Sequence, residues 1–65
     1  MVGNVVGAKG RIIKISSSEE KMAVAEIEGH GEWNIRTNSE IELFVGKSVE
    51  VIEMRGKYLL VNQIN

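Results

Sequence analysis

The chain has 65 residues, enough for one small domain over residues 1–65 but too few for a deep substrate cleft, because such a chain buries only about 60% of its unfolded surface. It has no cysteine, which excludes disulfides and cysteine-ligated zinc. Eight Lys and Arg residues against nine acidic ones leave a net charge of −1, which gives no long-range attraction to nucleic acid or anionic lipid.

The first predicted strand runs from Val5 to Ile15 and contains Gly7 and Gly10. A first strand that coils strongly, as in a small barrel, accommodates glycine where it bends. The polar residues 16–20 then predict a turn.

Residues 21–28 alternate, with Ala23, Ala25 and Ile27 on one face and Glu26 and Glu28 on the other, which is the period of a half-buried strand. The sequence Gly29-His30-Gly31 predicts a tight turn, and residues 33–37 alternate again as a third strand. These two segments therefore predict a hairpin.

The apolar stretch 41–45 is too short for more than a linking loop or one helical turn. Residues 47–54 predict a fourth strand with Val49 and Val51 facing inward, and Ile52 interrupts the alternation, which predicts a β-bulge. After a turn at 55–57, residues 58–61 predict the fifth strand.

Five short strands with frequent glycines indicate an all-β fold, and we expect a five-stranded Greek-key OB-fold barrel, with an SH3-like barrel as the alternative. The link between the third and fourth strands falls where an OB-fold carries a helix or loop. The predicted core is Val6, Ile12, Ala23, Ala25, Ile27, Trp33, Ile35, Ile41, Val49, Val51, Leu59 and Val61.

An ordered set of glycine, valine and tryptophan positions extends from Val6 to Val61. It comprises Val6-Gly7-x-x-Gly10, Ala25-x-Ile27-x-Gly29, Glu32-Trp33-Asn34, Ile41, Gly46-x-x-Val49-x-Val51 and Gly56-x-x-Leu59-x-Val61. The set resembles the soluble C-terminal domain of NfeD proteins, although the proline-glycine turn common after the first strand of that family is replaced by Ser16-Ser17-Ser18.

The resemblance implies an OB-fold domain of a membrane protein that is encoded beside stomatin-like proteins, and it implies a stomatin-like partner. The chain itself contains no apolar run of the roughly 18 residues that span a bilayer. Membrane association is therefore expected only through a parent protein, and a cytoplasmic location stays open.

Catalysis is not expected, because His30 is the one histidine and has no cysteine or aspartate partner for a nucleophile triad. Glu28, His30 and Glu32 are close in sequence, but one histidine with two mobile glutamates is a poor zinc site. We therefore predict no catalytic residue, no cofactor and no metal.

Single-stranded nucleic acid is the alternative partner, because OB-folds bind oligonucleotides over their second and third strands. Here the outward side of the second strand carries Glu26 and Glu28, which repel phosphate. Six basic residues are candidates for a patch: Lys9, Arg11, Lys14, Arg36, Arg55 and Lys57.

A non-catalytic protein-interaction module is the preferred interpretation, with apolar side chains outside the core forming the contact surface. The candidates for partner binding are Met22, Val24, Phe44, Ile52, Met54, Tyr58 and Leu60.

Overall fold

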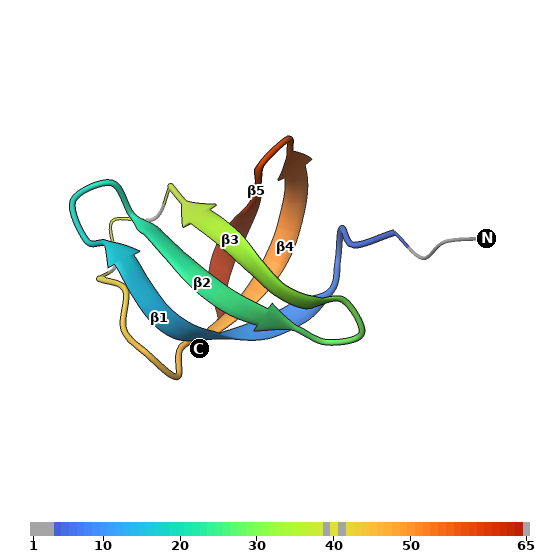
Figure 1. Cartoon of the computed structure of the whole chain (residues 1–65), viewed down its shortest axis with the longest axis horizontal. Coiled ribbons are helices and arrows are strands. Elements are labelled where there is room, and N and C mark those ends of the chain that lie inside the picture. The colour runs from blue at the N-terminus through green and yellow to red at the C-terminus, as the bar shows by residue number, and fades with distance from the viewer. Residues whose placement is uncertain (1–3, 39, 41, 65) are drawn as a thin grey trace.

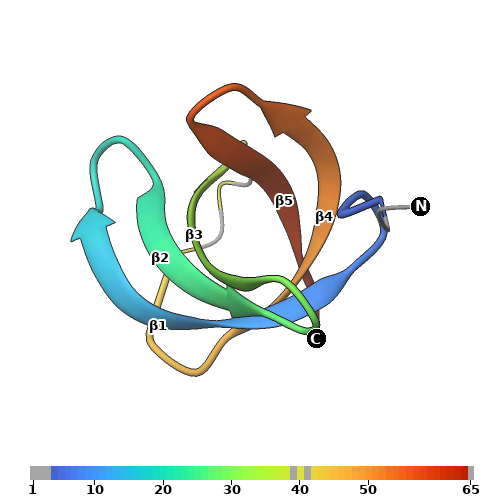
Figure 2. The same cartoon turned by 45° about the vertical axis from the view of Figure 1, so that its right-hand side comes forward.

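The computed structural model describes residues 4–38, 40 and 42–64. These residues form five strands: β1 (Lys9–Ser17), β2 (Met22–Ile27), β3 (Gly31–Thr37), β4 (Ser48–Arg55) and β5 (Tyr58–Ile64). The strands close into a barrel in the order β1-β2-β3-β5-β4, which is consistent with an OB-fold-like barrel (Figures 1 and 2). The predicted all-β, five-stranded fold is thereby confirmed.

Two pairings close the barrel. β3 and β5 pair in parallel over Ile35–Thr37 and Leu59–Val61, and β1 pairs with the start of β4 over Lys9–Arg11. The remaining neighbours form antiparallel pairs: β1 with β2, β2 with β3, and β4 with β5. The β1–β2 and β4–β5 hairpins extend beyond the closed part of the barrel (Figure 1).

Period-two alternation fills the interior of the barrel. The strand residues of the core are Ile12, Ala23, Ala25, Ile27, Ile35, Val49, Val51, Leu59 and Val61, each at most 1% exposed. All of them were predicted to be in the core. The predicted bulge is also confirmed, because the register of β4 against β5 shifts between Val51 and Glu53, which leaves Ile52 as the extra residue.

Val6 is 43% exposed, so its predicted place in the core is wrong, and Val5 is buried instead. The cause is a turn before β1: the Val6 amide donates to Asn4 Oδ1 at 2.9 Å and the Ala8 amide to the Val5 carbonyl at 3.0 Å. Gly7 occupies the left-handed region with φ 93°. The turn changes which of the two valines faces inward.

Trp33 is half-buried at the edge of the core, and predicted core residue Ile41 lies outside the described residues. Leu43, in the link between β3 and β4, joins the core although the sequence did not single it out. The link therefore contributes an apolar side chain to the barrel interior.

The indole of Trp33 secures the turn between β2 and β3, because its Nε1 donates to the His30 carbonyl oxygen at 2.9 Å. We expect Trp33→Phe to lower the free energy of unfolding by about 1 kcal/mol, the usual net value of one such hydrogen bond. Urea denaturation followed by far-UV circular dichroism measures this. Since the acceptor is a backbone atom, His30→Ala should change stability by less than about 0.5 kcal/mol; an equal loss in both variants would contradict the role of the indole.

Candidate functional site

The outer face of β2, β3 and β5 carries a row of residues formed by the strand pairing. Met22 on β2 lies opposite Arg36 on β3, and Arg36 lies opposite Leu60 on β5. Leu60 in turn lies opposite Glu53 on β4. Directly opposite residues point to the same side of a sheet, so these four side chains form one line across the outside of the barrel. We call the surface around this line the outer face.

Other predicted partner-binding residues join this surface. Val24 is half-buried and pairs with Asn34 of β3, one step along from Met22. Tyr58 lies opposite Arg55 at the end of the β4–β5 hairpin. Ile52, the bulge residue beside Glu53, is 42% exposed. The register therefore places Met22 and Val24 on β2, and Tyr58 and Leu60 on β5, to either side of β3, whereas Ile52 lies farther round the barrel on β4.

Leu60 differs from the expectation for an exposed apolar contact, because only 7% of its surface is exposed. It is nevertheless outside the core cluster, on the other side of the sheet from Leu59 and Val61. A hollow of about 250 Å³ above it is lined by Arg36, Asn38, Arg55, Tyr58 and Leu60 itself. Leu60 thus forms the apolar part of a small polar hollow.

Arg55 is held at the rim of this hollow by Glu53 on the same strand. Arg55 Nε lies 3.0 Å from Glu53 Oε2, and Arg55 Nη2 donates to Glu53 Oε1 at 3.1 Å. The hydrogen bond that Arg55 donates to Glu53, and secondly the charge of Glu53, raise the pKa of the Arg55 guanidinium above its usual value. Both side chains are about half exposed, so the pair orients the guanidinium and adds little to stability.

Phe44 and Met54 lie away from the outer face. Phe44 is 53% exposed in the link before β4, with Lys47 Nζ 5.3 Å from the centre of its ring. Met54 is 52% exposed and lies opposite the inward-facing Leu59, so it is on the other side of the hairpin from Glu53 and Arg55. The predicted set of partner-binding residues is therefore divided among three places.

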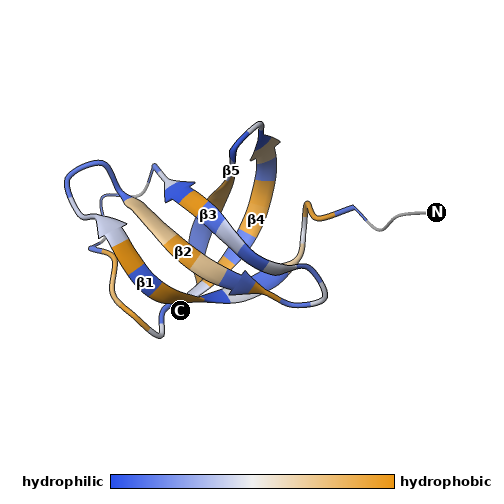
Figure 3. Ribbon diagram, viewed as in Figure 1, coloured by the Kyte–Doolittle hydropathy of each residue, from blue (hydrophilic) through white to orange (hydrophobic). Residues whose placement is uncertain are grey.

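A second exposed apolar patch lies where the link before β4 meets β1, and the sequence did not predict it. The Gly46 amide donates to the Ile12 carbonyl oxygen at 2.8 Å, which ties the link to β1. Beside this contact Ile13 is 40% exposed and Val45 is 61% exposed. The apolar colouring of the link and of β1 is visible in Figure 3. Ile13 points outward because it alternates with the buried Ile12, and the register shift between Ile12 and Lys14 then turns Ile15 back toward the core.

The strand edges are poorly suited to accept a further strand. Among the described residues, β4 beyond Val51 pairs only with β5, and this edge carries the bulge at Ile52 and the charged Glu53 and Arg55. The corresponding edge of β1 beyond Ile12 has register shifts around Ile13 and Ser16. Bulges and charges of this kind discourage edge-to-edge pairing. Side-chain surfaces are thus the better candidates for contact.

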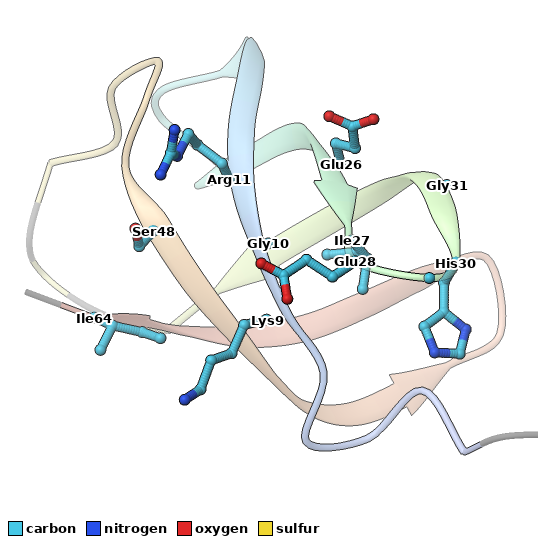
Figure 4. A pocket seen from close by; sticks show the side chains of 11 residues that line it. Lys9, Gly10, Arg11, Glu26, Ile27, Glu28, His30, Gly31, Ser48 and Ile64 are labelled. Carbon is cyan, nitrogen blue, oxygen red and sulfur yellow. The ribbon is translucent and has the colours of Figure 1, made fainter.

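A larger hollow of about 810 Å³ lies near the turn between β2 and β3, and it contains most of the residues considered for chemistry. Lys9 and Arg11 come from β1, Glu26 comes from β2, and Glu28 and His30 come from the turn after it. Figure 4 shows that the side chains of Lys9, Glu26 and His30 point in different directions. Within the part of the chain that the structure describes, no three His, Asp or Glu side chains are grouped as metal ligands.

The basic residues that were candidates for a nucleic-acid-binding patch lie in separate places on the surface. Lys9 and Arg11 line the larger hollow together with two glutamates, whereas Arg36 and Arg55 line the smaller one. On the outer face, Glu26 and Glu32 lie directly opposite each other between β2 and β3. A continuous basic track for a phosphate backbone is therefore not formed by these residues.

Among solved structures, the C-terminal domain of stomatin operon partner protein 1510-C from Pyrococcus horikoshii is similar to this chain. The TM-score is 0.77, with 19% sequence identity, over 100% of this chain and 98% of the matched chain. This chain has the fold of that domain. The match to the Pyrococcus domain supports the NfeD resemblance of the sequence.

Sequence comparisons add nothing to this structural match, because no protein-family model and no curated protein matches the chain. Across the described residues there is also no helix with the length and apolar character needed to cross a membrane.

Proposed function

We propose that this chain is a non-catalytic protein-interaction module that uses its outer face to bind a stomatin-like protein. The observation that carries the proposal is the row of apolar side chains on the outer face: Met22 lies opposite Arg36, and Tyr58 and Leu60 line the small polar hollow together with Arg36. Apolar side chains grouped outside a core and rimmed by polar residues are typical of protein contact surfaces.

The identity of the partner is proposed from two likenesses that agree. The sequence resembles NfeD C-terminal domains, and the fold matches a domain of a stomatin operon partner protein. By the same resemblance we propose that the domain works near a membrane as part of a longer protein. The divergent side chains of the larger hollow support a non-catalytic role, because catalysis requires groups that converge on one reacting atom (Figure 4).

Titration of the domain with the purified cytosolic region of a stomatin-like protein from the same organism, followed by calorimetry, tests the proposal. We expect Met22→Thr combined with Val24→Thr to weaken binding by about tenfold or more, which corresponds to about 1.4 kcal/mol or more. Threonine keeps the preference for a strand at both positions.

Phe44→Thr is the matched control, because it removes an exposed apolar side chain that lies off the outer face. Binding should remain within about twofold of the original value. Loss of binding in Phe44→Thr alone would assign the contact to the link before β4. No heat of binding with the unaltered domain at about 1 mM would contradict the proposed partner.

A further inference from the structure

Among the described residues, those that line the smaller hollow of the outer face include hydrogen-bond donors but no carboxylate, and Glu53 beside it is engaged by Arg55. The lining residues are Arg36, Asn38, Arg55, Tyr58 and Leu60. Arginine has five N–H donors and no acceptor, and the asparagine amide and tyrosine hydroxyl can also donate. Such a lining, above an apolar floor, is complementary to an anionic oxygen group.

The two guanidinium groups differ in how they are engaged. Arg55 uses Nε and Nη2 on Glu53, which fixes its plane and leaves further N–H groups for a ligand. Arg36 makes neither an ion pair nor a side-chain hydrogen bond with any residue of the described chain, and it is exposed. The hollow therefore has one pre-oriented cation and one cation without an internal counter-charge.

The surroundings favour one isolated anionic group over a chain of them. Toward the other end of β2 and β3 the outer face carries Glu26 and Glu32, which would repel successive phosphates. Next to Arg36, in contrast, Met22 on β2 supplies an apolar contact. An aspartate or glutamate with an apolar neighbour matches both features, because its carboxylate can accept two parallel N–H bonds from one guanidinium.

We propose that this hollow binds a single acidic side chain of a protein partner, with Arg36 as the principal contact to its carboxylate. The apolar residue beside that acidic side chain lies on Met22. This inference rests on the proposed function and names the chemistry of the partner segment that the outer face recognises. It makes Arg36 the residue that determines the specificity for that segment.

The test is a titration of the ¹⁵N-labelled domain with blocked tripeptides, followed by amide chemical shifts. The first probe is acetylated leucyl-glutamyl-leucine amide, and the second has glutamine in place of glutamate. We expect saturable shifts around Arg36, Arg55 and Leu60 with the first probe, and about tenfold weaker binding of the second, which is the effect of losing a charge-assisted hydrogen bond.

Arg36→Gln removes the charge but keeps a long polar side chain at an exposed position, and we expect it to bind both probes equally weakly. Arg11→Gln is the control, because it removes a cation that lines the other hollow, and it should retain the preference for the acidic probe. Equal binding of both probes by the unaltered domain, or shifts confined to the larger hollow, would overturn the inference.

Two further titrations distinguish a protein carboxylate from a free phosphate or a nucleic acid as the anion that binds. Inorganic phosphate or oligothymidylate that binds at Arg36 more tightly than the acidic tripeptide would overturn the assignment to a protein carboxylate. The proposed function has a different readout, the titration with the stomatin-like protein. Binding of that protein without any preference between the tripeptides contradicts only the present inference, whereas preference for the acidic tripeptide without binding of that protein contradicts only the proposed partner.

Discussion

Replacement of Ile35 by alanine is expected to unfold most of the protein at 25 °C. Ile35 is 0% exposed, lies opposite Ala23 on β2 and opposite Leu59 on β5, and so connects both sides of the barrel interior. Truncation of a buried isoleucine costs about 2–5 kcal/mol, and a single core of this size seldom supplies more than about 3–5 kcal/mol of stability. Urea denaturation, monitored by Trp33 fluorescence and by circular dichroism, measures the change.

Ile13→Ala is the matched control for this prediction, because it removes the same atoms from a side chain that is 40% exposed on the outside of β1. We expect it to lower the free energy of unfolding by less than about 1 kcal/mol. If the two alanine variants had similar stability, Ile35 would not be a central residue of the core, and the inward and outward assignment of these strands would be wrong.

Replacement of Gly10 by alanine is expected to cost about 3 kcal/mol, although the backbone of Gly10 is not in the left-handed region. A Cβ atom there would overlap the Glu26 carbonyl oxygen and lie 2.7 Å from Ile27 Cδ1. The Glu26 backbone belongs to the β1–β2 ladder and Gly10 is paired on its other side with Val49, so neither strand can withdraw freely. The same denaturation experiment gives the value.

Gly29→Ala separates this steric effect from backbone strain. Gly29 has φ 80° in the turn after β2, but no atom lies within 4 Å of a Cβ added there. The left-handed conformation alone should cost about 1–2 kcal/mol for alanine. A loss in Gly29→Ala equal to or larger than that in Gly10→Ala would show that close strand approach is not the reason for glycine at position 10.

Much of the barrel was predictable because alternation directly encodes which side of a strand is buried. Ala23, Ala25 and Ile27 follow this pattern, and Ile52 marked the bulge by interrupting it. The pattern failed where local hydrogen bonding changes the register, as in the turn that exposes Val6. Leu43 was missed because a loop residue has no periodicity to indicate burial.

The outer face was predictable in its residues but not in its arrangement. Apolar residues at outward positions indicated Met22, Val24 and Tyr58, but their association depends on the parallel register of β3 against β5. That register joins distant segments, and hydrophobic spacing within each segment does not define it. The burial of Leu60 between Arg36 and Tyr58, and the hollow above it, therefore required the tertiary structure.

The seam between β1 and β4 joins strands from opposite ends of the chain, and the parallel pair of β3 and β5 also joins segments that no short turn connects. The three hairpins can form from neighbours in sequence, but these two junctions must bring remote residues together before any contact energy is gained. Most of the loop-closure entropy that folding costs is therefore lost when these two junctions form, late in the assembly of the barrel. A nascent chain in which β5 has not yet been synthesised lacks the strand that both β3 and β4 pair with, so the barrel can close only after β5 has left the ribosome.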